Sequence, residues 1–335
     1  MDSRQPLLDV QNLSVIFETS GGMFSRQSVV AIDRISFQLD RDQPKLLTVV
    51  GESGSGKTTL ARTLLGLQQP SGGAIRFQGK DLTAMNRSDW HEYRRQVQPV
   101  FQDPYATYNP FYRIDRVLDM IVRKFDLASS AQEAKQLIVD ALHAVDLRPQ
   151  DVLGRYPHQL SGGERQRVML ARIYLMKPRI IVADEPISMV DAALRALFLN
   201  ILLDFRDQHG ISCIFITHNL ATAYYLGGDI MVMCRGRVIE QGNMDPVVAE
   251  PAHPYTQLLL DSVPSSDPTE RWQEKRGAQA VETSELEFSA NACVFVSRCP
   301  HVMDICHQQR PEHIPVAAEH AAACFLHSET ITSSL

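Results

Sequence analysis

A glycine-rich octapeptide with a lysine near its end constrains the fold of this chain more than any other feature. It fits the pattern G-x-x-x-x-G-K-[ST] and consists of Gly51, Glu52, Ser53, Gly54, Ser55, Gly56, Lys57 and Thr58. The apolar run 46–50 before it predicts a buried strand, and the stretch 59–65 after it predicts a helix. Because a strand and a helix flank the loop, we favour a nucleotide phosphate site over a glycine-rich turn without a ligand.

The residue types in this loop explain how it would hold phosphate and a metal ion. Glycines let the backbone curl so that N–H groups point at phosphate oxygens, and the start of the helix adds partial positive charge. Lys57 can reach the β- and γ-phosphates, and the Thr58 hydroxyl can bind Mg²⁺. Together with Thr59, which opens the helix, the octapeptide forms the predicted site for ATP and Mg²⁺.

A pair of carboxylates follows a second apolar run. Asp184 and Glu185 come directly after 180–183, at the carboxyl end of a predicted parallel strand, where ligands gather in such sheets. Asp184 can hold Mg²⁺ through water, and Glu185 can orient or polarise the attacking water. Alone, such a pair is as often a solvated strand end as a site. Because a phosphate loop is also present, we interpret the pair as catalytic.

The order of the apolar segments predicts an α/β fold. The runs 46–50, 180–183 and 213–217 are apolar throughout, as in a parallel sheet that helices cover on both faces. The segments 7–17 and 29–39 alternate more, which predicts an antiparallel β flank.

The rest of this domain predicts helices. No strong strand signal occurs at about 105–175, and apolar residues recur at helical spacing in 133–147. We therefore expect one main domain at about 1–262 with a helical insert. The net charge of −6 argues against a protein that coats nucleic acid, so no nucleic-acid partner is expected.

The sequence shows neither a membrane span nor an export signal. No apolar run reaches the roughly 18 residues of a spanning helix. The beginning of the chain lacks the basic and then apolar pattern of a signal peptide. We therefore expect a cytosolic protein whose role at a membrane, if it has one, is peripheral.

A second octapeptide resembles the signature of ABC-transporter ATPase subunits. It consists of Leu160, Ser161, Gly162, Gly163, Glu164, Arg165, Gln166 and Arg167. The same residues predict a capped helix that runs to Met176, with Ser161 as N-cap and Glu164 closing a capping box. The resemblance implies a P-loop cassette with a RecA-like parallel core, an antiparallel β flank and a helical signature subdomain. It also implies that Ser161, Gly162, Gly163 and Glu164 contact the ATP of a partner subunit.

The resemblance implies roles for four further residues. Gln102 is similar to the Q-loop glutamine, which meets Mg²⁺ and the transmembrane partner. Asp191 lies in 188–191, which resembles the D-loop, and His218 resembles the switch histidine that contacts the γ-phosphate. Arg26 falls near the position where such ATPases stack an aromatic ring on adenine, so this chain departs from the family there.

Three further segments are similar to the oligopeptide/dipeptide importer ATPases, namely 101–110, 156–159 and 253–256. That family implies a second, non-identical ABC ATPase subunit, paired head to tail, two permease subunits and an external solute-binding protein. The location implied is the cytoplasmic face of the inner membrane. Several members of the family carry sugars or glycosides instead of peptides, so both substrate classes remain open.

The end of the chain is rich in cysteine and histidine. A polar linker is expected at 263–285, followed by an extension at 286–335 that contains Cys293, Cys299, Cys306 and Cys324. Four thiolates match tetrahedral Zn²⁺ or a [4Fe–4S] cluster, and free thiols are a third possibility. The resemblance favours the cluster, because importer ATPases with such an extension bind one. We expect the histidines of the extension to be solvated. Its expected role is structural, or a contact to the partner ATPase.

Two rival functions remain at this stage. One is a soluble ABC ATPase that acts in translation or DNA repair, and the other is a metal or redox sensor that uses the cysteines. The chain has one cassette and no sustained heptads, whereas translation proteins carry two cassettes and repair proteins carry long coiled coils. We therefore favour the ATPase subunit of an importer.

Overall fold

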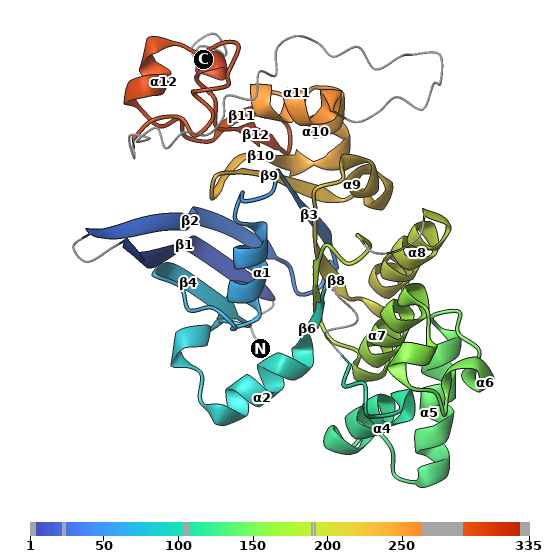
Figure 1. Ribbon diagram of the computed structural model, residues 1–335. Helices are drawn as coiled ribbons and strands as arrows, with labels where there is room; N and C mark the ends of the chain where they lie inside the picture. The colour runs from blue at the N-terminus through green and yellow to red at the C-terminus, as the bar shows by residue number, and fades with distance from the viewer. Residues whose placement is uncertain are drawn as a thin grey trace, which may run out of the picture. The chain divides into compact units, whose positions relative to one another are not determined.

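The computed structural model describes residues 5–21, 25–102, 108–188, 190, 192–262 and 291–328. The chain divides into two compact units that interleave along the sequence. Unit 1 comprises Met1–Leu13, Ser36–Leu47 and Thr58–Ile216. Unit 2 comprises Ser14–Ile35, Thr48–Lys57 and Thr217–Leu335. Figure 1 shows the helices and strands coloured in chain order.

Unit 1 contains three parallel strands at one end of a larger sheet. Its strands β6 (Val97–Val100), β7 (Ile180–Asp184) and β8 (Ser212–Thr217) run parallel, with β7 in the middle. The start of β3 (Leu46–Val50) lies beside β8, where the Cys213 N–H donates to the Lys45 carbonyl at 2.9 Å. All residues of β3 and β8 are buried, which confirms the strands predicted from the apolar runs.

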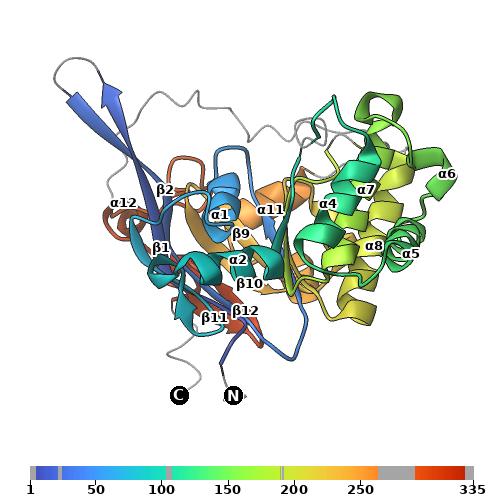
Figure 2. The same ribbon diagram turned by 90° about the horizontal axis from the view of Figure 1, so that it is seen from below.

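The described part of the predicted helical insert is built from helices. Residues 108–179 contain no strand, and their helices are α4 (Ile114–Lys124), α5 (Ala131–His143), α6 (Pro149–Val152), η3 (Pro157–Gln159) and α7 (Gly162–Met176). These helices lie together in Figures 1 and 2. In α4, the buried residues recur at helical spacing, namely Ile114, Leu118, Ile121 and Val122. As a helix, this segment therefore buries one apolar face.

A second, smaller sheet corresponds to the predicted β flank. Its strands β1 (Leu8–Gly21), β2 (Ser25–Leu39), β4 (Gly72–Phe77) and β5 (Lys80–Asp81) follow the order β2-β1-β4-β5. The predicted segments 7–17 and 29–39 fall almost entirely within β1 and β2. The other helices of unit 1 are α1 (Lys57–Leu64), η2 (Leu82–Ala84), α2 (Arg87–Gln96) and α8 (Ala192–His209).

Unit 2 contains the end of β3 and an antiparallel set of strands. These are β9 (Asp229–Cys234), β10 (Arg237–Asn243), β11 (Ile314–Ala317) and β12 (His320–Ala322). β10 pairs with β9 on one side and with β12 on the other, and β12 pairs with β11. The unit's helices are α9 (Leu220–Leu226), α10 (Met244–Ala249), α11 (Pro254–Asp261), α12 (Asp304–Gln308) and η4 (Phe325–His327).

The cysteine-bearing segment packs into unit 2. Its strand β12 extends the antiparallel sheet at β10, as Figure 1 also shows. Phe295, Cys293 and Cys306 join the same buried cluster as Val50 and Tyr255. The predicted linker at 263–285 lies outside the described residues, so its boundaries remain predictions.

The expectation that the histidines of this segment are solvated holds for His301, His307 and His313, which are exposed. It is wrong for His320, which is buried with its Nε2 2.7 Å from Oε1 of Glu240. The Glu240 carboxylate is completely buried and also accepts hydrogen bonds from the N–H groups of Ala252 and His253, at 2.7 and 2.9 Å. A buried carboxylate needs such partners, and His320 is one of them.

Candidate nucleotide site

The phosphate loop follows β3 and leads into α1, as its sequence predicts. Two of its glycines cannot be replaced without strain. Gly51 has a φ of +152°, and a Cβ there would lie 2.2 Å from the Met233 carbonyl oxygen. Gly56 has a φ of +100°, and a Cβ there would lie 2.2 Å from the Ala31 carbonyl oxygen. The loop therefore packs so tightly against neighbouring backbone that only glycine fits at either position.

Lys57 is held inside this loop. Its Nζ donates to the carbonyls of Gly51 and Glu52, both at 2.7 Å, and to the Ser55 hydroxyl at 3.2 Å. The residue is only 5% exposed. The loop thus closes around a fixed ammonium group, which is the positive charge that a phosphate site requires.

In unit 1, residues far apart in sequence bring the predicted metal and water ligands together. The Thr58 hydroxyl lies 3.4 Å from Oδ1 of Asp184, and Nε2 of Gln102 lies 3.5 Å from Oε2 of Glu185. Glu185 has a φ of +44°, and its N–H donates to the Ile216 carbonyl at 2.9 Å. Such a backbone is unusual for a non-glycine residue and is typical of functional positions.

The predicted cap of the signature helix is confirmed. Ser161 and Glu164 form a reciprocal capping box at the start of α7, with distances of 2.8 and 3.2 Å. Burial opposes ionisation of Glu164, but the hydrogen bonds from Ser161 and the charges of Arg167 and Arg155 outweigh it and lower the pKa of the carboxyl. Ser161 is exposed and Gly162 is half-buried, whereas Gly163 is buried.

Gln166 is a site residue that the sequence analysis did not single out. Its Nε2 donates to the Pro186 carbonyl at 2.6 Å and lies 3.4 Å from the Phe101 carbonyl oxygen. It therefore joins α7 to the chain beside Glu185 and to the chain beside Gln102. The sequence feature that could have indicated this role is its position within the signature octapeptide.

The other predicted site residues are only partly described. His218 is exposed between β8 and α9, and Asn219 caps α9 by accepting from the Thr222 N–H. Arg26 lies in β2, but its side chain is outside the described part of the structure, and Asp191 lies outside it entirely.

The four cysteines of the C-terminal segment line one small cavity. All six cysteines of the chain are described, and all are free thiols. Burial raises the pKa of Cys293 and Cys299, and it raises the pKa of Cys324 to about 11. Among the described residues, no group of three or more His, Cys, Asp or Glu side chains is arranged to hold a metal ion.

The fold and these residues together define an ATPase of the ABC cassette class. A solved dimeric structure of the ATP-binding cassette MJ0796 with ADP and Pi has a TM-score of 0.62 and 22% identity, covering 71% of this chain and 98% of that chain. CbiO1 of Clostridium perfringens has a TM-score of 0.61 and 24% identity, covering 74% and 92%. Likeness at this identity shows the fold alone, and it confirms the predicted cassette.

Sequence comparisons are more specific. The ABC transporter family matches residues 32–188, and the oligopeptide/dipeptide transporter C-terminal region matches residues 239–306. The di/tripeptide transport ATP-binding protein DppF of Pseudomonas aeruginosa is 36% identical over 312 residues, covering 92% of this chain and 94% of the relative. The dipeptide transport protein DppF of Haemophilus influenzae is 35% identical, covering 96% of each chain.

The chain belongs to the ABC transporter ATP-binding proteins of the oligopeptide/dipeptide type. It is therefore an ATP-hydrolysing subunit that works with membrane permeases. Within the described part of the chain, every helix is too short or too polar to cross a bilayer.

Proposed function

We propose that this subunit drives the import of dipeptides or oligopeptides by hydrolysing ATP at residues 51–59 and the carboxylates that follow β7. The observation that carries the proposal is the distance of 3.4 Å between the Thr58 hydroxyl and the Asp184 carboxylate, which are 126 residues apart in sequence. A hydroxyl and a carboxylate meeting beside a phosphate loop are the ligands Mg²⁺ takes in P-loop ATPases. The relatives named for peptide transport support the substrate class.

Each residue has a distinct role in this proposal. Thr58, Asp184 and Gln102 hold Mg²⁺, which when bound neutralises phosphate charge. Lys57 and the loop N–H groups bind the phosphates. Glu185 accepts a proton from the attacking water, and Gln102 orients its carboxylate from 3.5 Å. His218 contacts the γ-phosphate, Arg26 stacks on adenine, and Asp191 contacts the partner ATPase.

The signature residues Ser161, Gly162, Gly163 and Glu164 serve the partner's ATP. Ser161 at the start of α7 is exposed, and the helix end carries partial positive charge; both suit the phosphates of a nucleotide held by another subunit. We infer a head-to-tail pair with a second ATPase subunit, which we propose to be non-identical. ATP binding would close the pair, and hydrolysis would reopen it.

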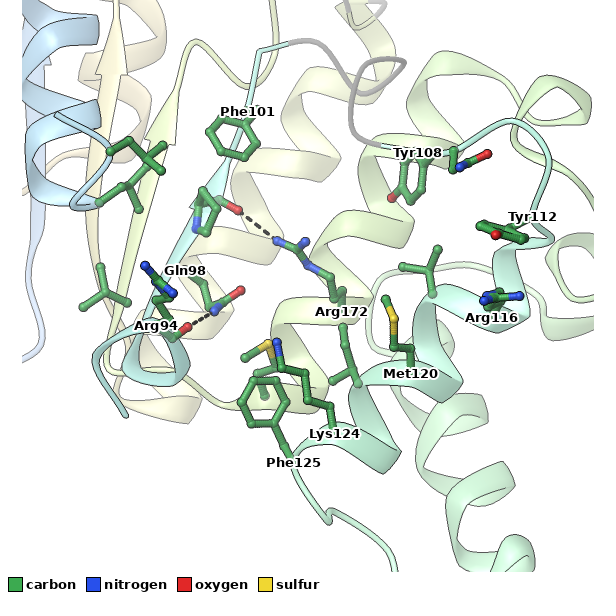
Figure 3. Close-up of a pocket in the computed structure, with 18 residues that line it drawn as sticks. Arg94, Gln98, Phe101, Tyr108, Tyr112, Arg116, Met120, Lys124, Phe125 and Arg172 are labelled. Carbon is green, nitrogen blue, oxygen red and sulfur yellow. Dashed lines mark hydrogen bonds between the residues drawn. The ribbon is translucent and has the colours of Figure 1, made fainter. Parts of the chain in front are cut away.

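A cavity of about 600 Å³ in unit 1 is our candidate docking site for a segment of a permease (Figure 3). Phe101, Tyr112 and Met120 line it and are 36%, 42% and 55% exposed. Basic side chains also line it, namely Arg94, Arg116, Lys124 and Arg172. We assign it to a cytoplasmic helix of a permease with an apolar face and acidic residues. Docking there would hold the chain at the cytoplasmic face of the inner membrane.

Transport by the reconstituted complex tests this function. Vesicles containing this chain, its partner ATPase and both permeases, supplied with the solute-binding protein, should accumulate a labelled dipeptide or oligopeptide. Lys57→Ala should abolish uptake and weaken ATP binding. Met120→Glu should release the permeases while the purified chain still binds ATP. Uptake of a sugar or glycoside in place of peptides would overturn the substrate class.

We further propose that Cys293, Cys299, Cys306 and Cys324 hold a [4Fe–4S] cluster. All four line one cavity, which supports a shared ligand. Four cysteine thiolates are the ligand set of a [4Fe–4S] cluster, and four cysteines line this cavity. The cluster would supply four bonds that staple the segment.

Metal analysis of anaerobically purified protein tests the cluster. Iron and sulfide should each approach about four per chain, with a brown colour. Cys306→Ser should lower the iron content, whereas Cys213→Ser, which changes a buried cysteine of β8, should retain it. One zinc per chain without sulfide would favour the zinc site, and no metal after reconstitution would favour free thiols.

A further inference from the structure

The C-terminal segment makes a direct ionic contact with the phosphate loop. Nη1 and Nη2 of Arg298 donate to the two carboxylate oxygens of Glu52, at 2.9 and 2.8 Å. This is a bidentate fork between a guanidinium and a carboxylate, the geometry that gives strong and directional ion pairs. Both residues belong to unit 2, although 246 residues separate them in sequence.

Aromatic side chains fix the position of this fork. The guanidinium carbon of Arg298 lies 5.2 Å from the ring centre of Phe295 and 5.8 Å from that of Tyr255. Both rings are buried, and they contact each other edge to face at 5.4 Å. The Tyr255 hydroxyl also accepts a hydrogen bond from the Glu52 N–H at 2.9 Å. The backbone and the side chain of Glu52 are therefore both held by residues outside the loop.

Glu52 presents an electrostatic problem in its own loop. A carboxylate next to a site for polyphosphate would repel the ligand. In the fork, its charge is neutralised, and its side chain is turned toward Arg298. Its carbonyl meanwhile accepts from Nζ of Lys57 at 2.7 Å, so the same residue connects the fork to the phosphate-binding lysine.

We propose that Arg298 is a positioning residue for nucleotide binding, which neutralises Glu52 and holds the first turn of the phosphate loop. The cysteine-bearing segment is then part of the nucleotide site through this side chain. This inference rests on the proposed role of residues 51–58 in binding ATP.

Nucleotide titration of the purified full-length chain tests the proposal. Arg298→Ala should weaken MgATP binding about 5–20-fold, because it leaves a carboxylate unpaired beside the phosphates. Adding Glu52→Gln to Arg298→Ala should restore most of the affinity, since no charge then remains to repel the ligand. Arg298→Lys should have an intermediate effect. In the assembled transporter, Arg298→Ala should raise KM for ATP and leave kcat nearly unchanged.

A matched control is Arg310→Ala. Arg310 lies in the same segment and pairs with Asp33 at 3.1 Å, so its loss removes an ion pair away from Glu52. It should bind MgATP like the unmodified chain. Thermal unfolding of each variant reports whether it is folded. Unchanged affinity in folded Arg298→Ala, or a double variant no better than Arg298→Ala, would overturn the inference. Failure of the unmodified chain to bind MgATP would instead overturn the proposed nucleotide site.

Discussion

Glu185 combines two properties that single it out among the carboxylates of the chain. Its backbone adopts the left-handed conformation with φ of +44°, and its carboxylate lies 3.5 Å from the Gln102 amide. A strained backbone persists only where its surroundings impose it, and here the N–H of Glu185 bonds to the Ile216 carbonyl of β8. The sheet thus fixes the backbone from which this side chain projects.

The variant Glu185→Gln should bind MgATP normally and hydrolyse it about 10²–10⁴-fold more slowly, because an amide cannot accept the proton of the attacking water. Phosphate release by the assembled transporter measures the rate. Glu250→Gln, an exposed carboxylate at the end of α10, is the matched control and should hydrolyse ATP normally. Near-normal turnover in Glu185→Gln would remove it from the catalytic role.

At the scale of elements, the start of α7 combines a serine cap with the residues that resemble the ABC signature. Ser161 caps the helix in a reciprocal box with Glu164, and Ser130 caps α5 by accepting from the Glu133 N–H at 3.2 Å. Both N-cap bonds join a serine hydroxyl to a backbone N–H, although the Glu133 carboxylate accepts from Ser129 instead of closing a box, and both helices belong to unit 1. They differ in that α7 alone carries the signature residues.

Ser161→Ala and Ser130→Ala should therefore each lower the free energy of unfolding by about 1 kcal/mol, the usual contribution of a serine N-cap. Urea unfolding of both variants checks this value. In the assembled transporter, Ser161→Ala should also reduce ATP hydrolysis, while Ser130→Ala should not. Equal ATPase rates for the two variants would mean that Ser161 acts only as a cap.

Local sequence patterns predicted most of the helices and strands. Contacts between residues far apart in the sequence could not be predicted from such patterns. The buried strands, the phosphate loop and the cap at Ser161 depend on residues close in sequence. β11 contains Pro315, and β12 has three residues, so neither shows a strand pattern. The residues around Arg298 in the sequence do not indicate that Glu52 is its partner. The two residues are 246 positions apart, and a local sequence pattern cannot reveal a contact over that separation.

At the scale of the whole molecule, a buried side-chain contact between His320 and Glu240 joins β12 to β10. Glu240 is completely buried, and His320 supplies one of its three hydrogen bonds. β12 contributes this histidine from 80 residues further along the chain. Unit 2 therefore depends on its C-terminal segment for a polar partner as well as for apolar packing.

Removing this partner should destabilise the protein strongly. His320→Ala should lower the free energy of unfolding by about 3–5 kcal/mol, because it leaves the buried Glu240 carboxylate short of a partner. His320→Gln, which keeps a donor, should be less affected. His307→Ala, an exposed histidine of α12, is the control and should unfold like the unmodified chain. Indistinguishable thermal midpoints for His320→Ala and His307→Ala would contradict this account.

The contact between Glu52 and Arg298 has a consequence for biosynthesis. A ribosome that adds about 5–20 residues per second needs roughly 12–50 s to travel the 246 residues between them. Late in that time the nascent chain contains its phosphate loop, Asp184 and Glu185, but it still lacks Arg298. If Arg298 positions the loop as proposed, we expect MgATP binding to strengthen only when the chain is nearly complete. On the same proposal, we expect a chain that ends before Arg298 to compete less well for ATP than the full-length chain.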